Sequence, residues 1–412
     1  MLIFLMKSCR MVKIIKGGTH MKNTIYDYVD LRGDLSPIDF PYNEIDFLIF
    51  SELSYINLDE IIQLDYDHII TIHDAFLAYN DFYKNTNMPL NPTIRESYTL
   101  FEKMAKSYRY QNIQMISFVN DIDKELIKQF SAMTLILENQ DMVVVYRGTD
   151  DSLVGWHEDF LMLCENVVPA QLSSVEYLKY ISDFSYSYSL LDSLKNKYLA
   201  PSFFQRLKKH FQYKKQRPIY LTGHSKGGNL AMYAGCFIDS EIQKRIIQIY
   251  NYDGPGFQDE IMLSSEYKNM LPIIQSYIPH YSFFGIVLGH EENYHVVHSH
   301  YTGMLQHNGF SWEVGPYHFV EDELSCESVN FAIKVLLFLE KLSNEDKHLF
   351  VDSMFKLFDT LNLYTFSDLS HISYKHILGA IKELTLLDSK VRKMLIEVLH
   401  MLWLEAKKTK PE

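Results

Sequence analysis

The sequence feature that most restricts the fold is a glycine-flanked serine between a predicted strand and a predicted helix. Residues 217–222 read as a short strand, and Gly223-His224-Ser225-Lys226-Gly227 follows at once. The next residues, 227–238, are rich in small side chains and predict a helix. Glycines on either side of the serine keep Cβ atoms out of the crowded turn. The run therefore predicts an exposed serine in a fixed position.

A turn of this kind is where a serine hydroxyl becomes a nucleophile. The hydroxyl needs a neighbouring base to take its proton, and the amides that open the next helix point toward the oxyanion that develops. A lone Gly-x-Ser-x-Gly often occurs by chance, so an ordinary turn serine is the alternative. The preceding strand and the small residues of the helix (Gly227, Gly228, Ala231, Ala234 and Gly235) favour Ser225 as a nucleophile.

Strands alternate with helices through the middle of the chain. We expect strands at 112–118, 131–137, 142–147, 217–222, 246–252, 272–278 and 294–299, and helices at 43–63, 94–106, 173–196, 201–214 and 227–238. The alternation predicts an α/β protein with a mostly parallel sheet and helices on both faces. With the serine turn, this is the α/β-hydrolase fold.

Both ends of the chain differ from this pattern. From residue 326 we expect only leucine-rich helices, at 326–342, 345–359, 374–385 and 389–407. We therefore predict an α/β-hydrolase domain over 21–325 and a helical C-terminal subdomain over 326–412. Residues 1–20 read as a non-native extension, because Lys16-Gly17-Gly18 can be encoded by a purine-rich ribosome-binding sequence and Met21 follows at a suitable distance for initiation.

Composition excludes several classes of partner. The net charge of −13 argues against nucleic acid, and no run of 18 apolar residues predicts a membrane span. Cys9, Cys164, Cys236 and Cys326 have neither metal-ligand spacing nor a disulfide pattern. We expect thiols in a reducing, cytoplasmic compartment; the sequence carries no signal for the oligomeric state.

A second motif lies on the loop after the strand at 142–147. Gly148-Thr149 follows the buried run Val143–Arg147, at the place where such a fold builds an oxyanion donor. Thr149 offers its backbone amide and its hydroxyl, and Lys226 its backbone amide only. The alternative is a strand-ending turn capped by Thr149 or Asp150.

Together these motifs resemble a known group of proteins. Tyr-Arg-Gly-Thr at 146–149, Trp156 and Asp159, with the serine run at 223–231, resemble the class 3 lipases. The chain is more similar to the Mbeg-type lipase-like family of bacterial proteins, through 30–34, 252–257, Gln306-His307 and 311–314. The resemblance spans about residues 22–400. It implies an α/β-hydrolase fold and hydrolase activity, and it names no substrate.

The base is expected on a loop after the last core strand, because the chain order in this fold is serine, acid, histidine. His307 fits this position and falls on the Gln-His motif of the family. His298 and His300 are the alternatives. The remaining histidines of this region read as packed or surface residues: His280, His290, His295 and His318.

For the acid we predict Asp253, which ends the strand at 246–252. Asp-Gly-Pro-Gly is also a strong turn signal, so a turn residue is the alternative. In the class 3 lipases the acid follows the next strand, but the corresponding stretch at 277–282 has no carboxylate. Glu291 and Glu292 come later and are the alternative acids.

Three nearby histidines raise the question of a metal site. Strand alternation places His298 and His300 on one face and His295 on the other. No cysteine or clustered carboxylate in the sequence completes a ligand set, so we predict no metal.

The sequence thus predicts a lipase- or esterase-type hydrolase that cleaves a small-molecule ester or lipid. Ser225 attacks the carbonyl, His307 takes its proton and Asp253 orients His307. Thr149 and Lys226 hold the oxyanion, and no cofactor is required. The alternative is an inactive α/β-hydrolase scaffold that serves as a binding protein.

Overall fold

We describe a computed structural model of the chain, in which residues 22–83, 92–184, 186–189, 212–360, 389, 392–394 and 396–397 are defined. The proposed extension 1–20 and the helices expected at 374–385 and 389–407 lie outside these residues, entirely or for the most part. The two domain boundaries stay predictions.

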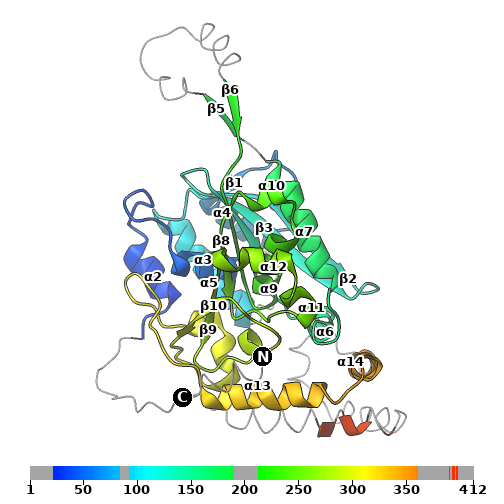
Figure 1. Cartoon of the computed structure of the whole chain (residues 1–412). Helices are drawn as coiled ribbons and strands as arrows, with labels where there is room; N and C mark the ends of the chain where they lie inside the picture. The colour runs from blue at the N-terminus through cyan, green and yellow to red at the C-terminus, as the bar shows by residue number, and fades with distance from the viewer. Residues whose placement is uncertain are drawn as a thin grey trace, which may run out of the picture.

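An eight-stranded sheet forms the centre of the molecule (Figure 1). Its strand order follows the chain: β1 (Ile70–Thr71), β2 (Gln114–Asp123), β3 (Lys128–Ile136), β4 (Met142–Tyr146), β7 (Ile219–His224), β8 (Ile246–Tyr252), β9 (Ile274–Pro279) and β10 (Asn293–Val297). The pairs from β1 to β4 are antiparallel, and the pairs from β4 to β10 are parallel. The predicted α/β class with a mostly parallel sheet is confirmed.

Helices bury both faces of the sheet because its central strands are apolar on both sides. Val143 and Val145 of β4 face one core, with α2 (Ile25–Arg32), α3 (Glu44–Leu53), α4 (Ile72–Tyr83) and α5 (Pro92–Lys106). Met142, Val144 and Tyr146 face the other core, with α7 (Pro169–Ser182), α9 (Lys226–Phe237), α11 (Asp259–Met262) and α12 (Ser265–Met270). A small separate sheet pairs β5 (Tyr186–Ser189) with β6 (Gln212–Lys215).

In the continuously described part of the chain, up to residue 360, the sheet is followed by α13 (Cys326–Leu339) and α14 (Asn344–Thr360). Phe338 of α13 and Phe350 of α14 share an apolar cluster with Leu153 and Leu161 of α6 (Leu153–Leu161). Val329 and Ala332 of α13 belong to another cluster, with Ile278 of β9. The start of the predicted helical region therefore packs directly on the α/β body.

Register brings the ends of the parallel strands together. Tyr146 of β4 pairs with Gly223 of β7, and His224 pairs with Tyr252 of β8. Tyr252 pairs in turn with Tyr277 of β9. The loops that follow these strands therefore emerge side by side at one edge of the sheet, where ligands bind in open α/β folds.

Some local expectations are wrong. The helix expected over 43–63 ends at Leu53, because the backbone bonds then reach three residues back instead of four. The amide of Ser54 donates to the Ser51 carbonyl at 3.2 Å, and the amide of Ile56 to the Leu53 carbonyl at 3.1 Å. Residues 186–189 and 212–214 are strand rather than helix, since they pair with each other.

The cysteines also depart from the expectation in part. Cys164 and Cys236 carry free thiols, whereas Cys326 is disulfide-bonded. The expectation of unpaired thiols is therefore wrong for Cys326, because spacing along the chain does not report spatial proximity. None of the described helices is long and apolar enough to cross a membrane.

Candidate active site

Ser225 sits at the sharp turn between β7 and α9 with an unfavourable backbone conformation, φ 56° and ψ −132°. Its amide donates to the carbonyl of Tyr252 at 2.8 Å. A Cβ atom added at Gly223 would lie 2.2 Å from the carbonyl carbon of Gly227, and one at Gly227 would lie 2.2 Å from the oxygen of Tyr146. Glycine is therefore required at both positions, and the fold maintains a backbone strain of roughly 1–3 kcal/mol at the serine.

His307 ends the short helix η4 (Gly303–His307) and contacts the carboxylate of Asp253. The distance from His307 Nδ1 to Asp253 Oδ2 is 2.6 Å, and Asp253 is fully buried. The other oxygen of Asp253 accepts hydrogen bonds from the Ser282 hydroxyl at 2.5 Å and from the Gly285 amide at 3.1 Å. The carboxylate is thus held in one orientation, with one oxygen directed at the imidazole.

The imidazole of His307 is held beside the serine turn by two aromatic neighbours. Its centroid lies 4.3 Å from that of Phe284 and 4.7 Å from that of His224, the residue before Ser225. Phe284 and Ser225 line the same cavity. The structure therefore brings Ser225, His307 and Asp253 to one place at the carboxyl edge of the sheet.

His224 is a buried, neutral imidazole that supports this arrangement. Burial and, to a smaller extent, the nearby His307 lower its pKa to about 3. His224 Nε2 lies 2.8 Å from the His307 carbonyl, which can only accept, so Nε2 carries the proton. Nδ1 then accepts from the Tyr55 hydroxyl at 3.2 Å. Sequence reasoning did not identify this role, because Tyr55 lies on a distant segment.

The loop after β4 lies against the serine turn. A Cβ atom at Gly148 would lie 3.1 Å from the Cβ of Ser225. The Thr149 hydroxyl donates to Asp159 Oδ2 at 2.5 Å, so the donor proton of that hydroxyl is already engaged. The Thr149 amide remains a candidate oxyanion donor. The Lys226 amide is the other, because amides in the first turn of a helix have no acceptor within the helix.

The side chain of Lys226 points away from this position into a buried ion pair. Lys226 Nζ lies 2.9 Å from Glu158 Oε2 and 3.7 Å from Asp159 Oδ1. Glu158 also accepts from the amides of Gln129 at 3.0 Å and Ala170 at 2.7 Å. Burial disfavours the charge of Lys226, but the two carboxylates outweigh burial and raise its pKa. Burial raises the pKa of Asp159 to about 6 despite the adjacent Lys226.

The model of the Mbeg1-like family matches residues 104–356, more than half of the chain. This chain belongs to the Mbeg1-like family. The matched region contains Thr149, Ser225, Asp253 and His307. No curated protein matches the chain.

Two solved structures are similar to this Mbeg1-like chain at low identity. One, described as the M37 lipase, is 13% identical with a TM-score of 0.30, over 59% of this chain and 69% of its own. The other, a fungal lipase–inhibitor complex described as a model for interfacial activation, is 11% identical with a TM-score of 0.33, over 70% and 94%.

An apolar cavity of about 270 Å³ opens beside Ser225 in the Mbeg1-like chain. Its walls come from α6, the η3 region (Phe284–Ile286), α13 and α14. The apolar lining residues are Trp156, Phe160, Met162, Leu163, Pro255, Phe283, Phe284, Val287, Leu288, Met304, Phe331, Val335, Phe338, Leu339, Phe350 and Val351. The described C-terminal helices therefore form part of the wall of the site.

The alternative acids of the Mbeg1-like chain have other contacts. Glu292 is buried and accepts from the hydroxyls of Tyr267 and Ser276, with His290 Nδ1 at 2.7 Å. Burial disfavours its charge, but the adjacent His290 and the hydrogen bonds from His290 and Tyr267 outweigh burial and lower its pKa to about 2. Glu291 is exposed. Neither contacts His307 in the described part of the chain.

The other histidines are likewise placed elsewhere. His298 Nδ1 contacts Asp322 at 2.8 Å, and His280 Nδ1 lies 3.3 Å from the same carboxylate. His290 contacts Glu292, His295 stacks on Tyr277 with centroids 5.0 Å apart, and His318 contacts Glu44 at 2.7 Å.

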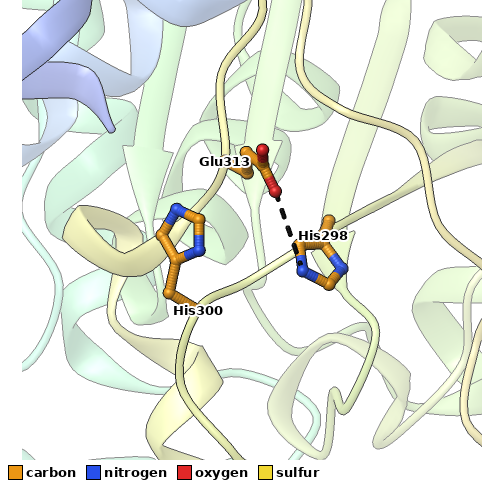
Figure 2. Close-up of side chains that lie close together, drawn as sticks. All are labelled: His298, His300 and Glu313. Atoms are coloured by element: carbon orange, nitrogen blue, oxygen red, sulfur yellow. Dashed lines mark ion pairs between the residues drawn. The ribbon is translucent and has the colours of Figure 1, made fainter. Parts of the chain in front are cut away.

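His300 and His298 do, however, meet a carboxylate that the sequence did not suggest. Glu313 lies beside both rings (Figure 2). The statement that no carboxylate completes a ligand set is wrong, because a β-bridge brings residues 299 and 312 together.

Proposed function

We propose that this protein is a serine hydrolase of lipase or esterase type that cleaves a carboxylic ester. The observation that carries the proposal is the contact between His307 and the buried Asp253, 2.6 Å apart, beside a serine held in a strained strand-to-helix turn. Nucleophile, base and orienting acid then come from the ends of β7, the loop after β10 and the end of β8.

In this mechanism Ser225 Oγ attacks the ester carbonyl while His307 Nε2 takes its proton. Asp253 accepts from Nδ1–H, which fixes the tautomer and stabilises the imidazolium. The backbone amides of Thr149 and Lys226 stabilise the oxyanion. His307 then protonates the leaving alcohol, and water hydrolyses the acyl-enzyme with His307 as general base.

We propose an apolar acyl group as the part of the substrate that enters the cavity. The lining is almost entirely apolar, and burial contributes about 0.8 kcal/mol for each CH₂ group. A volume near 270 Å³ is slightly below the ~300–1,000 Å³ typical of ligand pockets. Short and medium acyl chains fit this volume better than long ones.

The binding-protein alternative rested on the missing carboxylate after Pro279. In the structure that stretch contributes Ser282, which holds Asp253 from the other side. The absence of an acid after Pro279 therefore no longer favours an inactive scaffold.

Turnover of short p-nitrophenyl esters by matched variants tests the proposal. We expect Ser225→Ala and His307→Ala to lower kcat/KM by at least about 10³-fold. His318→Ala, an exposed histidine paired with Glu44, is the control and should retain activity. Equal turnover by wild type and His307→Ala would reject the assigned base.

A further inference from the structure

Two imidazoles and a buried carboxylate meet away from Ser225, at the end of β10. One side-chain donor atom each from His298, His300 and Glu313 lies within 4.8 Å of the other two (Figure 2). His298 and His300 are two residues apart on an extended segment, so their side chains share a face. The bridge between residues 299 and 312 places Glu313 opposite His298, and the Glu313 amide donates to the His298 carbonyl at 2.8 Å.

The ring of His298 is oriented by an outer carboxylate. Asp322 Oδ2 accepts from His298 Nδ1 at 2.8 Å. Nδ1 is therefore the donor in this pair, and Nε2 lies 3.7 Å from Glu313 Oε2. Histidines that bind metals almost always donate their other ring nitrogen to a carboxylate or a carbonyl in this way.

His300 has a buried ring nitrogen without a hydrogen bond to the described residues. Its Nε2 atom is buried and has no hydrogen-bond partner among the described residues, whereas the backbone of Asn23 hydrogen-bonds to its ring. Buried polar atoms are nearly always satisfied, so an unsatisfied one requires an explanation. One nitrogen of this ring belongs to the group of three donor atoms, and a metal ion there would give the ring a partner.

We propose that His298, His300 and Glu313 bind one divalent transition-metal ion, and that zinc is the ion this donor set fits. Two imidazoles and one carboxylate are a common protein ligand set for zinc, with water in the fourth position. Ligands about 2.0–2.2 Å from the ion lie roughly 3.3–3.6 Å apart in a tetrahedron. The 3.7 Å separation of His298 and Glu313 is already close to this value.

The ion would act on the fold rather than on the ester. It would join the end of β10 to the segment that carries Glu313. The neighbouring Trp312 donates from its indole nitrogen to the Gln306 carbonyl at 2.8 Å, one residue before His307. The ion would therefore stabilise the loop that carries His307, and its binding can be measured without any esterase activity.

Zinc titration of the chelator-treated full-length protein by calorimetry tests this site. We expect one zinc ion per chain and a higher Tm with zinc than without it, because an ion that binds only the folded state stabilises it. His300→Ala and Glu313→Gln should each weaken zinc binding more than 10-fold, and Asp322→Asn about 10- to 100-fold. His318→Ala should bind zinc as wild type does.

Circular dichroism and Tm of the metal-free variants show whether each one folds. If Glu313→Gln does not fold, the zinc affinities of wild type and His300→Ala test the proposal. His300 is partly exposed, so its replacement should leave the fold intact. Absence of saturable zinc binding, or equal zinc affinity in wild type and His300→Ala, would overturn the proposal. Tighter binding of Ca²⁺ or Mn²⁺ than of Zn²⁺ would overturn the identification of the ion.

Discussion

Asp253 combines a left-handed backbone, φ 51°, with complete burial and three polar contacts. Aspartate and asparagine are among the few residues other than glycine that accept such a conformation. Because Ser282 and Gly285 occupy one oxygen, only the other can reach His307. Asparagine tolerates the same backbone and can keep the contacts of that oxygen, so Asp253→Asn removes the charge with little other change.

Replacement of Asp253 by asparagine should lower kcat by about 10⁴-fold with little change in Tm. Asparagine keeps the shape and the left-handed backbone, but its amide favours the wrong imidazole tautomer. Ester hydrolysis by the purified variant measures the effect. Glu292→Gln is the control, because Glu292 contacts His290 instead of His307. A larger loss in Glu292→Gln than in Asp253→Asn would reassign the acid.

Asp159 should make folding stability depend on pH. Its pKa in the fold, about 6, is raised above the ordinary value of 3.8 by burial. The stabilisation associated with its protonated form is complete below pH 3.8 and is lost as the pH rises through about 6. Asp159→Asn mimics the protonated side chain, so it should gain stability relative to wild type between pH 5 and pH 7.5.

The measurement is urea unfolding of wild type and Asp159→Asn at both pH values. The free energy of unfolding of the variant minus that of wild type is compared at the two pH values. Other carboxylates titrate in both proteins and cancel, so a change in this difference reports Asp159 alone. A difference that stays constant from pH 5 to pH 7.5 would show that the carboxyl of Asp159 titrates normally.

At the scale of elements, α6 and α9 are joined by the buried pair of Glu158 and Lys226. Each charge is acceptable in the interior only because the other is present. The backbone amide of Lys226 opens α9 next to Ser225, so this ion pair also fixes the start of the helix that would hold the oxyanion.

Removing the charge of Lys226 alone should therefore lower the free energy of unfolding more than removing the charges of Lys226 and Glu158 together. We expect Lys226→Met to destabilise the fold by about 3–5 kcal/mol, since it leaves Glu158 buried without its main cation. Lys226→Met combined with Glu158→Gln should recover much of that loss in denaturant unfolding. Lys244→Met, which breaks the exposed pair with Glu241, is the control and should have little effect. Additive losses in the double variant would argue against coupling.

The wall that α13 contributes should set acyl-chain selectivity. Val335 lines the cavity, whereas Leu337 on the same helix is 41% exposed and does not. Val335→Trp should lower kcat/KM for octanoate esters more than 10-fold and change acetate esters little, because the larger side chain fills acyl space. Leu337→Trp should leave the chain-length profile unchanged. An unchanged profile in Val335→Trp would place the acyl group elsewhere.

For the whole molecule, the sequence predicts what depends on local runs and misses what depends on distant partners. The apolar run at 142–147 and the glycines around Ser225 carry their structure locally, so the α/β class and the serine turn were predicted. The Glu158–Lys226 pair joins residues 68 apart in sequence and left no local signal. Glu313 was missed beside His298 and His300 for the same reason.

In the candidate site, too, local sequence predicts the main residues but not the contacts between distant segments. A turn motif predicts Ser225, chain order and the resemblance to the family's Gln-His motif predict His307, and the end of a strand predicts Asp253. The hydrogen bond from Ser282 to Asp253 depends on how β8 and β9 pair, which the sequence does not state. The cover that α13 and α14 provide over the cavity depends on packing between distant segments.

Covalent labelling by a fluorophosphonate tests most directly whether Ser225 is an activated nucleophile. Intact-mass and peptide mass spectrometry of the labelled full-length protein should show one adduct per chain, on the peptide that contains Ser225. Ser225→Ala should carry no adduct, and His307→Ala should react much more slowly. An unmodified wild-type protein, under conditions that fully label a known serine esterase, would contradict the account.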